Sequence, residues 1–152
     1  MKVDDAVEDK VREAFAAAVG GERDRFDSAV EAIARAGDEF GSRALNLSLA
    51  VDSAALYSVH GGQWPDSEQI ALLAGEFGEA EDWSGVEAQT VERLLTSLAR
   101  VRSPLEDLTV GELIFAVFAV GGWLLSAFPL PEGTHWNDFL DQILEGLEVA
   151  PE

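Results

Sequence analysis

Eighteen consecutive residues in the last third of this chain carry almost no polar side chain. The stretch LIFAVFAVGGWLLSAFPL runs from Leu113 to Leu130, and Ser126 alone within it has a hydroxyl, amide or charged side chain. At a rise of 1.5 Å per residue, a helix of this length spans about 27 Å, just short of the roughly 30 Å hydrocarbon core of a bilayer. Length alone therefore allows either a membrane-spanning helix or the buried central helix of a folded domain.

The residues that flank this stretch favour the buried helix. Acidic residues lie on both sides of it, Glu112 at its start and Glu132 just after it, and the nearest basic residue is Arg102. Since Lys and Arg on the cytoplasmic side normally orient a membrane span, nothing here would anchor one. Pro129 also shortens the uninterrupted helix. We predict a very apolar core helix over about residues 110–128 and no association with a membrane.

Gly121 and Gly122 stand in the middle of the apolar stretch. Each glycine costs a helix interior about 1 kcal/mol relative to alanine, so another interaction must offset the cost. We favour close approach of a crossing helix, with Phe118 and Trp123 packing beside the gap, over a kink that opens a pocket. A helix that is apolar on all faces must also be covered on all faces, and a symmetric homodimer through this helix is one way to cover it.

Helical periodicity and capping residues predict an all-α fold of about seven helices, without strand-type alternation. The sequence has no internal repeat and no linker long or polar enough to separate domains. We therefore predict that residues 1–152 form a single all-helical domain, a bundle around the apolar central helix. Counting their expected capping residues, the predicted helices cover about 5–19, 22–36, 38–60, 66–78, 84–101, 109–128 and 134–147.

The chain contains no cysteine, which excludes disulfides and thiolate metal sites and fits a reducing compartment. Its first residues, MKVDDAVEDKVREAF, are charged from the second position onward and lack the apolar segment of a secretory signal. We therefore expect a cytoplasmic protein.

The net charge is −19, from 29 acidic and 10 basic residues. Such a charge repels nucleic acids and anionic lipid surfaces, so we expect neither as a partner. All ten basic residues lie at or before Arg102, and nine acidic residues without a single base follow from Ser103 onward. This charge would attract a basic protein or cations. The alternative is that it serves only solubility, as in a generally acidic proteome.

Two acidic segments are candidate partner-binding surfaces. Near the expected end of the fourth helix, carboxylates oppose the helix macrodipole, and such a conflict can mark a functional site unless the helix ends early. In the last helix, carboxylates at i, i+3, i+7 and i+10 share one face without Lys or Arg, so a basic surface would relieve their repulsion; a solvated face is the alternative. The candidate residues are Glu76, Glu79, Glu81 and Asp82 in the first segment and Asp138, Asp141, Glu145 and Glu148 in the second.

A polar stripe runs along the third predicted helix. Asn46, Ser53, Tyr57 and His60 follow i, i+7, i+11 and i+14, so they share one face of an otherwise apolar element. The stripe is a candidate lining for a small-molecule pocket, or a source of a His-Tyr pair for proton transfer. The alternative is that water and neighbouring carbonyl groups satisfy these side chains.

No familiar catalytic, metal or nucleotide motif is present in the sequence. The two histidines exclude a three-histidine metal site, and although Glu132 and His135 have the Glu-x-x-His spacing of di-iron bundles, they lie in a Pro- and Gly-rich segment with no second copy. We expect no metal and no cofactor. An enzyme that uses His60 or His135 is the least favoured hypothesis, because no spacing assembles a nucleophile, a base and an oxyanion donor.

The sequence favours a non-enzymatic, acidic helical module for interaction or regulation, of the inhibitor, immunity or adaptor type, that docks a basic protein partner. The alternative is a helical domain that binds a small molecule, with the polar stripe facing the apolar helix across a pocket.

Overall fold

The apolar stretch forms the central helix, α6 (Val110–Ser126), of a computed structural model that describes residues 1–99 and 108–149. From Leu113 to Leu125 every residue of α6 is buried apart from Phe115, which is half-buried. None of the helices in the described ranges is both long and apolar enough to cross a membrane. The prediction of a buried core helix is confirmed.

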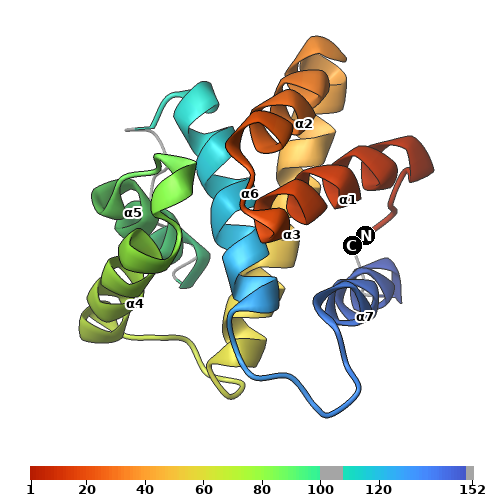
Figure 1. Cartoon of the computed structure of the whole chain (residues 1–152). Helices are drawn as coiled ribbons and strands as arrows, with labels where there is room; N and C mark the ends of the chain where they lie inside the picture. Colours follow the sequence, from red (N-terminus) through yellow and green to blue (C-terminus); the bar gives the residue numbers. More distant parts are fainter. Residues whose placement is uncertain (100–107, 150–152) are drawn as a thin grey trace.

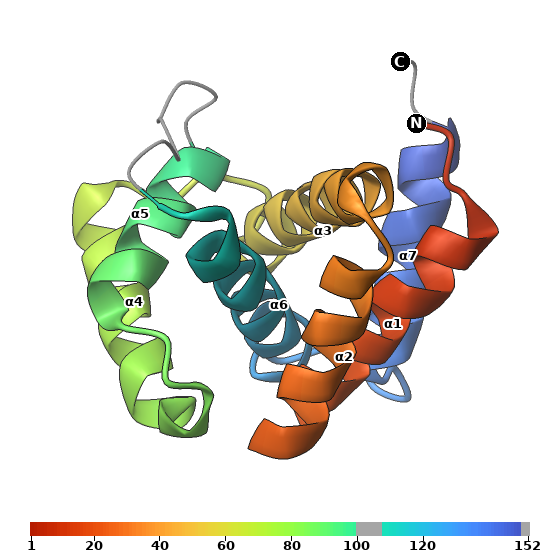
Figure 2. The same cartoon turned by 90° about the horizontal axis from the view of Figure 1, so that it is seen from above.

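Six further α-helices and one short 3-10 helix surround α6, and no strand occurs in the part of the chain that the structure describes. Figure 1 shows α4 and α5 on one side of α6 and α1 and α2 on the other, and the view from above in Figure 2 places α7 on the same side as α1. The predicted all-α bundle is confirmed. The remaining elements are α1 (Asp5–Gly20), α2 (Arg23–Arg35), α3 (Asp38–Val59), α4 (Ser67–Ala80), η1 (Asp82–Ser84), α5 (Ala88–Ala99) and α7 (Trp136–Val149).

Two of the predicted helix starts carry a capping box. In this motif the side chain of the cap residue accepts a hydrogen bond from the backbone N–H of the third helical residue, whose side chain accepts one from the backbone N–H of the cap residue. At α4, Asp66 accepts from the backbone of Gln69 at 2.9 Å, and the Gln69 side chain accepts from the Asp66 backbone at 2.8 Å. At α6, Thr109 and Glu112 make the same exchange. These two starts are therefore fixed by local sequence.

Other helix ends differ from the prediction. The fifth helix begins at Ala88 instead of at Ser84, because the Ser84 hydroxyl donates to the Glu81 carbonyl at 2.8 Å and holds a separate turn, η1. The first helix is capped by Asp4, whose carboxylate accepts from two backbone N–H groups. The last helix begins at Trp136. The predicted end of the fifth helix, at about residue 101, lies outside the described residues.

Two neighbouring helices reach the backbone of α6 at Gly121 and Gly122. A Cβ atom built on Gly122 would lie 2.6 Å from the Ala18 Cβ atom and 3.2 Å from a backbone nitrogen of α1. A methyl group on Gly121 would overlap the Phe15 ring of α1 and the Asp52 carboxyl group of α3. These contacts confirm the predicted close approach of a crossing helix. The central helix α6 runs through both glycines as one continuous helix.

The close approach offsets the low helix propensity of the two glycines. Phe15 is fully buried, and its ring meets the Phe118 ring edge-on at a centroid distance of 5.1 Å. Burying one phenylalanine side chain contributes about 1.5–3 kcal/mol, against about 1 kcal/mol lost at each helical glycine. The chain's own helices α1, α2, α3, α5 and α7 all pack against α6. These helices cover the apolar surface of α6 within one chain, and the homodimer stays a prediction.

Replacing Gly122 with alanine should destabilise the protein, although alanine is the better helix former. Overpacking of a tight core costs about 1–3 kcal/mol, and the gain in helix propensity is only about 1 kcal/mol. We expect Gly122→Ala to lower the free energy of unfolding by about 1 kcal/mol, as measured by urea denaturation.

Gly146→Ala is the matched control, since Gly146 is exposed on α7 and an added Cβ atom would meet nothing within 4 Å. This variant should raise the free energy of unfolding by about 0.5–1 kcal/mol. An equal gain for both variants would contradict the close approach of α1 to α6.

Candidate functional site

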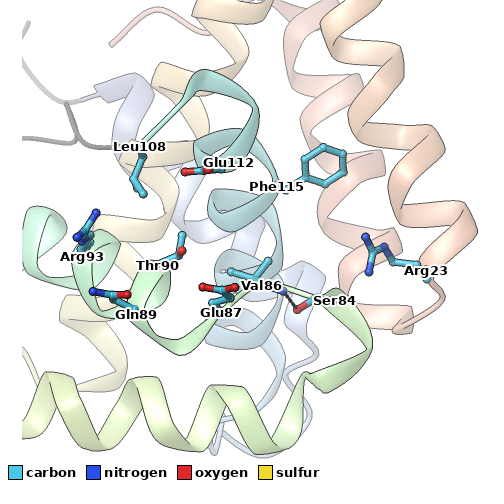
Figure 3. Close-up of a pocket in the computed structure, with 11 residues that line it drawn as sticks. Arg23, Ser84, Val86, Glu87, Gln89, Thr90, Arg93, Leu108, Glu112 and Phe115 are labelled. Atoms are coloured by element: carbon cyan, nitrogen blue, oxygen red, sulfur yellow. Dashed lines mark hydrogen bonds between the residues drawn. The ribbon is translucent and has the colours of Figure 1, made fainter.

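A cleft of about 530 Å³ lies between α2, η1, α5 and the first half of α6 (Figure 3). Its apolar lining comes from the half-buried side chains of Val86, Leu108 and Phe115. Phe115 is also the one residue of the buried run in α6 that is not fully covered, so the cleft marks the gap in the packing around the central helix. Its volume falls within the usual range of small-molecule sites.

Two arginines and two glutamates line the same cleft. Figure 3 shows Arg23 and Arg93 at opposite ends, with the carboxylates of Glu87 and Glu112 between them. The lining charges therefore balance, in a protein whose net charge is −19. The site cannot be predicted from the sequence, because its residues are up to about ninety positions apart and only the packing of α2 beside α5 and α6 brings them together.

The backbone turn after η1 positions Arg23. Gly85 adopts a left-handed backbone conformation, with a φ of +71°, that glycine adopts more readily than other residues. A Cβ atom at this position would lie 2.6 Å from the Arg23 Nη1 atom, so the guanidinium packs directly on the turn. The guanidinium donates to Asp27 from Nε at 3.0 Å and to the Trp83 carbonyl from Nη1 at 3.4 Å. Arg93, in contrast, takes part in none of the ion pairs found among the described residues.

The residues of the predicted polar stripe have different surroundings along α3. Asn46 is exposed and lines a second cleft, of about 410 Å³, beside the N-terminal segment. Ser53 is half-buried and donates to the Leu98 carbonyl at 3.5 Å. Tyr57 is exposed and packs on Trp64 at a centroid distance of 4.9 Å, and His60 caps the end of α3. Asn46 and His60 lie about 21 Å apart along the helix axis.

The acidic face of α7 is exposed as predicted from its spacing, but two of its four carboxylates have partners within the protein. Asp138 accepts from the His135 backbone at 2.9 Å at the start of the helix. Asp141 pairs with Arg12 of α1 at 2.6 Å. Glu145 and Glu148 are exposed and have no ion pair among the described residues.

Arg12 lies between two carboxylates and links α1 to α7. Partial burial acts to lower its pKa, but hydrogen bonds and charge attraction from Asp141 and Glu8 outweigh that effect and raise the pKa overall. The guanidinium therefore stays charged and holds Asp141 in place.

The acidic segment at the end of α4 likewise contains both exposed carboxylates and one that has a partner. Glu76, Glu79 and Asp82 are exposed, whereas Glu81 is half-buried and accepts a hydrogen bond from the Trp83 indole. Burial raises the pKa of Glu81, and the bond from Trp83 partly opposes that rise. The helix runs on to Ala80, past Gly78, so its end does not relieve the conflict between these acids and the macrodipole.

Asp52 is a buried acid that the sequence analysis overlooked. It is fully buried on α3, and among the described side chains its two oxygens are the buried polar atoms without a hydrogen-bond partner. Burial raises the pKa of Asp52 well above its usual range, because the charged form loses its hydration. The sequence feature that points to Asp52 is that it is the only charged residue between Arg43 and His60.

The two histidines and their acidic neighbours do not form a metal site in the described ranges. No group of three or more His, Asp or Glu side chains there is arranged to hold a metal ion. His135 is exposed at the start of α7, and His60 is half-buried at the end of α3.

Comparisons with protein-family models, curated proteins and solved structures found no match to this chain. Any function must therefore be argued from the chemistry of these side chains alone.

Asp52 should make the stability of the protein fall as the pH rises. Its pKa is higher in the folded than in the unfolded protein, so the folded state binds more protons above the unfolded pKa of about 4. The free energy of unfolding should then fall with pH, by up to about 1.4 kcal/mol per unit, until the folded pKa is reached.

Asp52→Asn isolates this effect, because an amide does not titrate. We expect the free energy of unfolding of the native protein, relative to that of Asp52→Asn, to decrease as the pH rises above about 4, the unfolded pKa of an aspartate. Asp82→Asn removes one exposed carboxylate with the same change in net charge but leaves Asp52 in place, so the dependence of its stability on pH should parallel that of the native protein. Parallel pH profiles for the native protein and Asp52→Asn would contradict the account.

Proposed function

We propose that this protein is an acidic helical interaction module that docks a basic protein partner on the outer face of α7. The observation that carries the proposal is the exposed pair Glu145 and Glu148, which take part in none of the ion pairs found among the described residues. A partner rich in Lys and Arg would gain attraction there at little cost, since these carboxylates need not first leave an internal ion pair.

The face of α7 is better suited to docking than the acidic segment at the end of α4. Its carboxylates, from Asp138 to Glu148, follow one continuous helix over about 15 Å. The α4 set is interrupted where the helix ends at Ala80 and the chain enters η1. Figures 1 and 2 place α4 and α7 on opposite sides of the bundle, so one compact partner would engage only one of the two surfaces.

Internal packing gives the α7 surface a fixed orientation. The opposite face of the helix buries Phe139, Leu140, Ile143 and Leu144 against the core, and Arg12 ties Asp141 to α1. A helix held in this way presents its carboxylates without a further ordering cost, which favours specific binding over diffuse attraction.

The test compares two matched double variants. Glu145→Gln with Glu148→Gln removes two charges from α7, and Glu76→Gln with Glu79→Gln removes two exposed charges of the same type and spacing from α4. Partners are captured at low salt, identified and purified, and their affinities for each variant are measured by calorimetry at low and high salt.

We expect the α7 variant to weaken binding of the basic partner about five- to tenfold and the α4 variant to change it less than about twofold. Affinity for the native protein should also fall as salt increases. Equal losses for the two variants, or binding that does not depend on salt, would refute docking on α7.

A further inference from the structure

We propose that the cleft between α2, α5 and α6 binds a small zwitterion with an apolar body, of the class of apolar amino acids and the dipeptides that contain them. This site is independent of the α7 surface, because Figure 2 places α5 and α7 on opposite sides of the bundle.

The apolar part of the ligand would rest on the uncovered part of the central helix. Phe115 projects from α6 into the cleft, and its ring is held by Phe26 at a centroid distance of 5.8 Å. Val86 and Leu108 complete this wall. All three side chains are half-buried, so a hydrocarbon group placed against them would remove apolar surface from water without any rearrangement of the core.

The charged groups of the cleft supply one site for an anion and one for a cation. Arg93 has no carboxylate partner among the described residues and can donate two parallel hydrogen bonds to a carboxylate. Glu87, from the turn that precedes α5, is exposed in the cleft and can accept from an ammonium group. Glu112 already accepts from the Thr109 backbone at 3.4 Å, which leaves Glu87 as the freer of the two carboxylates.

The same balance argues against other classes of ligand. A phosphate group or another polyanion would be attracted by Arg23 and Arg93 but repelled by the two glutamates between them. A simple amine would gain from the glutamates and lose near the arginines. A zwitterion satisfies both kinds of group, and a volume of about 530 Å³ suits a ligand of one or two residues.

The test titrates four small probes into the protein and follows them by NMR chemical-shift changes. L-phenylalanine carries both charges and a ring, phenylacetate lacks the ammonium group, phenethylamine lacks the carboxylate, and inorganic phosphate lacks the apolar body. We expect L-phenylalanine to shift the resonances of Phe115 and α5 and to bind about tenfold more tightly than the other three probes.

Two variants assign the charges, and a third serves as the control. Arg93→Gln and Glu87→Gln should each weaken L-phenylalanine about tenfold, because each removes a charge-assisted hydrogen bond. Arg35→Gln removes an arginine from α2 that is 80% exposed at its side chain and remote from the cleft, and it should leave the affinity unchanged. All three positions are exposed, and thermal denaturation would verify that the variants remain folded.

The outcomes separate the possible ligands. Equal binding of phenylacetate or phosphate would overturn the zwitterion assignment in favour of a simple anion site. An equal effect of Arg35→Gln would assign the binding to bulk charge, and no shift of Phe115 or α5 resonances with any probe would refute the site itself.

Discussion

The contact of α1 and α3 with the backbone of α6 at Gly121 and Gly122 is the constraint on which the other packing depends. Without side chains at these two positions, Phe15 and Ala18 reach the central helix directly, and the Asp52 carboxyl group lies beside Gly121. The close packing helps to bury α6, which is almost entirely apolar in a chain of net charge −19. A single added methyl group would force a helix to move.

The buried carboxyl group of Asp52 is a consequence of the same contact. The Asp52 carboxyl group occupies the space that Gly121 leaves open, and its lack of a hydrogen-bond partner among the described residues costs free energy that the surrounding hydrophobic burial must offset. The outer faces of the helices carry exposed carboxylates. Among the described residues, the ion pairs of the α7 carboxylates involve one cation, Arg12.

The sequence was sufficient for the architecture but only partly for the candidate sites. Periodicity and caps such as Thr109 with Glu112 act within one element, so the central helix and the all-α class could be predicted. The start of α5 could not, because Ser84 bonds backward to Glu81 and forms a separate turn. The cleft depends on Arg23 and Arg93, which are seventy positions apart, and the pairing of Asp141 with Arg12 likewise depends on how α7 packs on α1.

The most direct test of the central contact is a double-mutant cycle that moves one methyl group from α1 to α6. Ala18→Gly and Gly122→Ala would each be made alone and together, and the free energy of unfolding would be measured by urea denaturation for all four proteins. If the two positions touch as described, the double variant should be more stable than the sum of the single effects predicts, by about 1 kcal/mol, because removing the Ala18 methyl group makes room for the new one. Strict additivity of the two substitutions would contradict the close approach of α1 to the glycine pair.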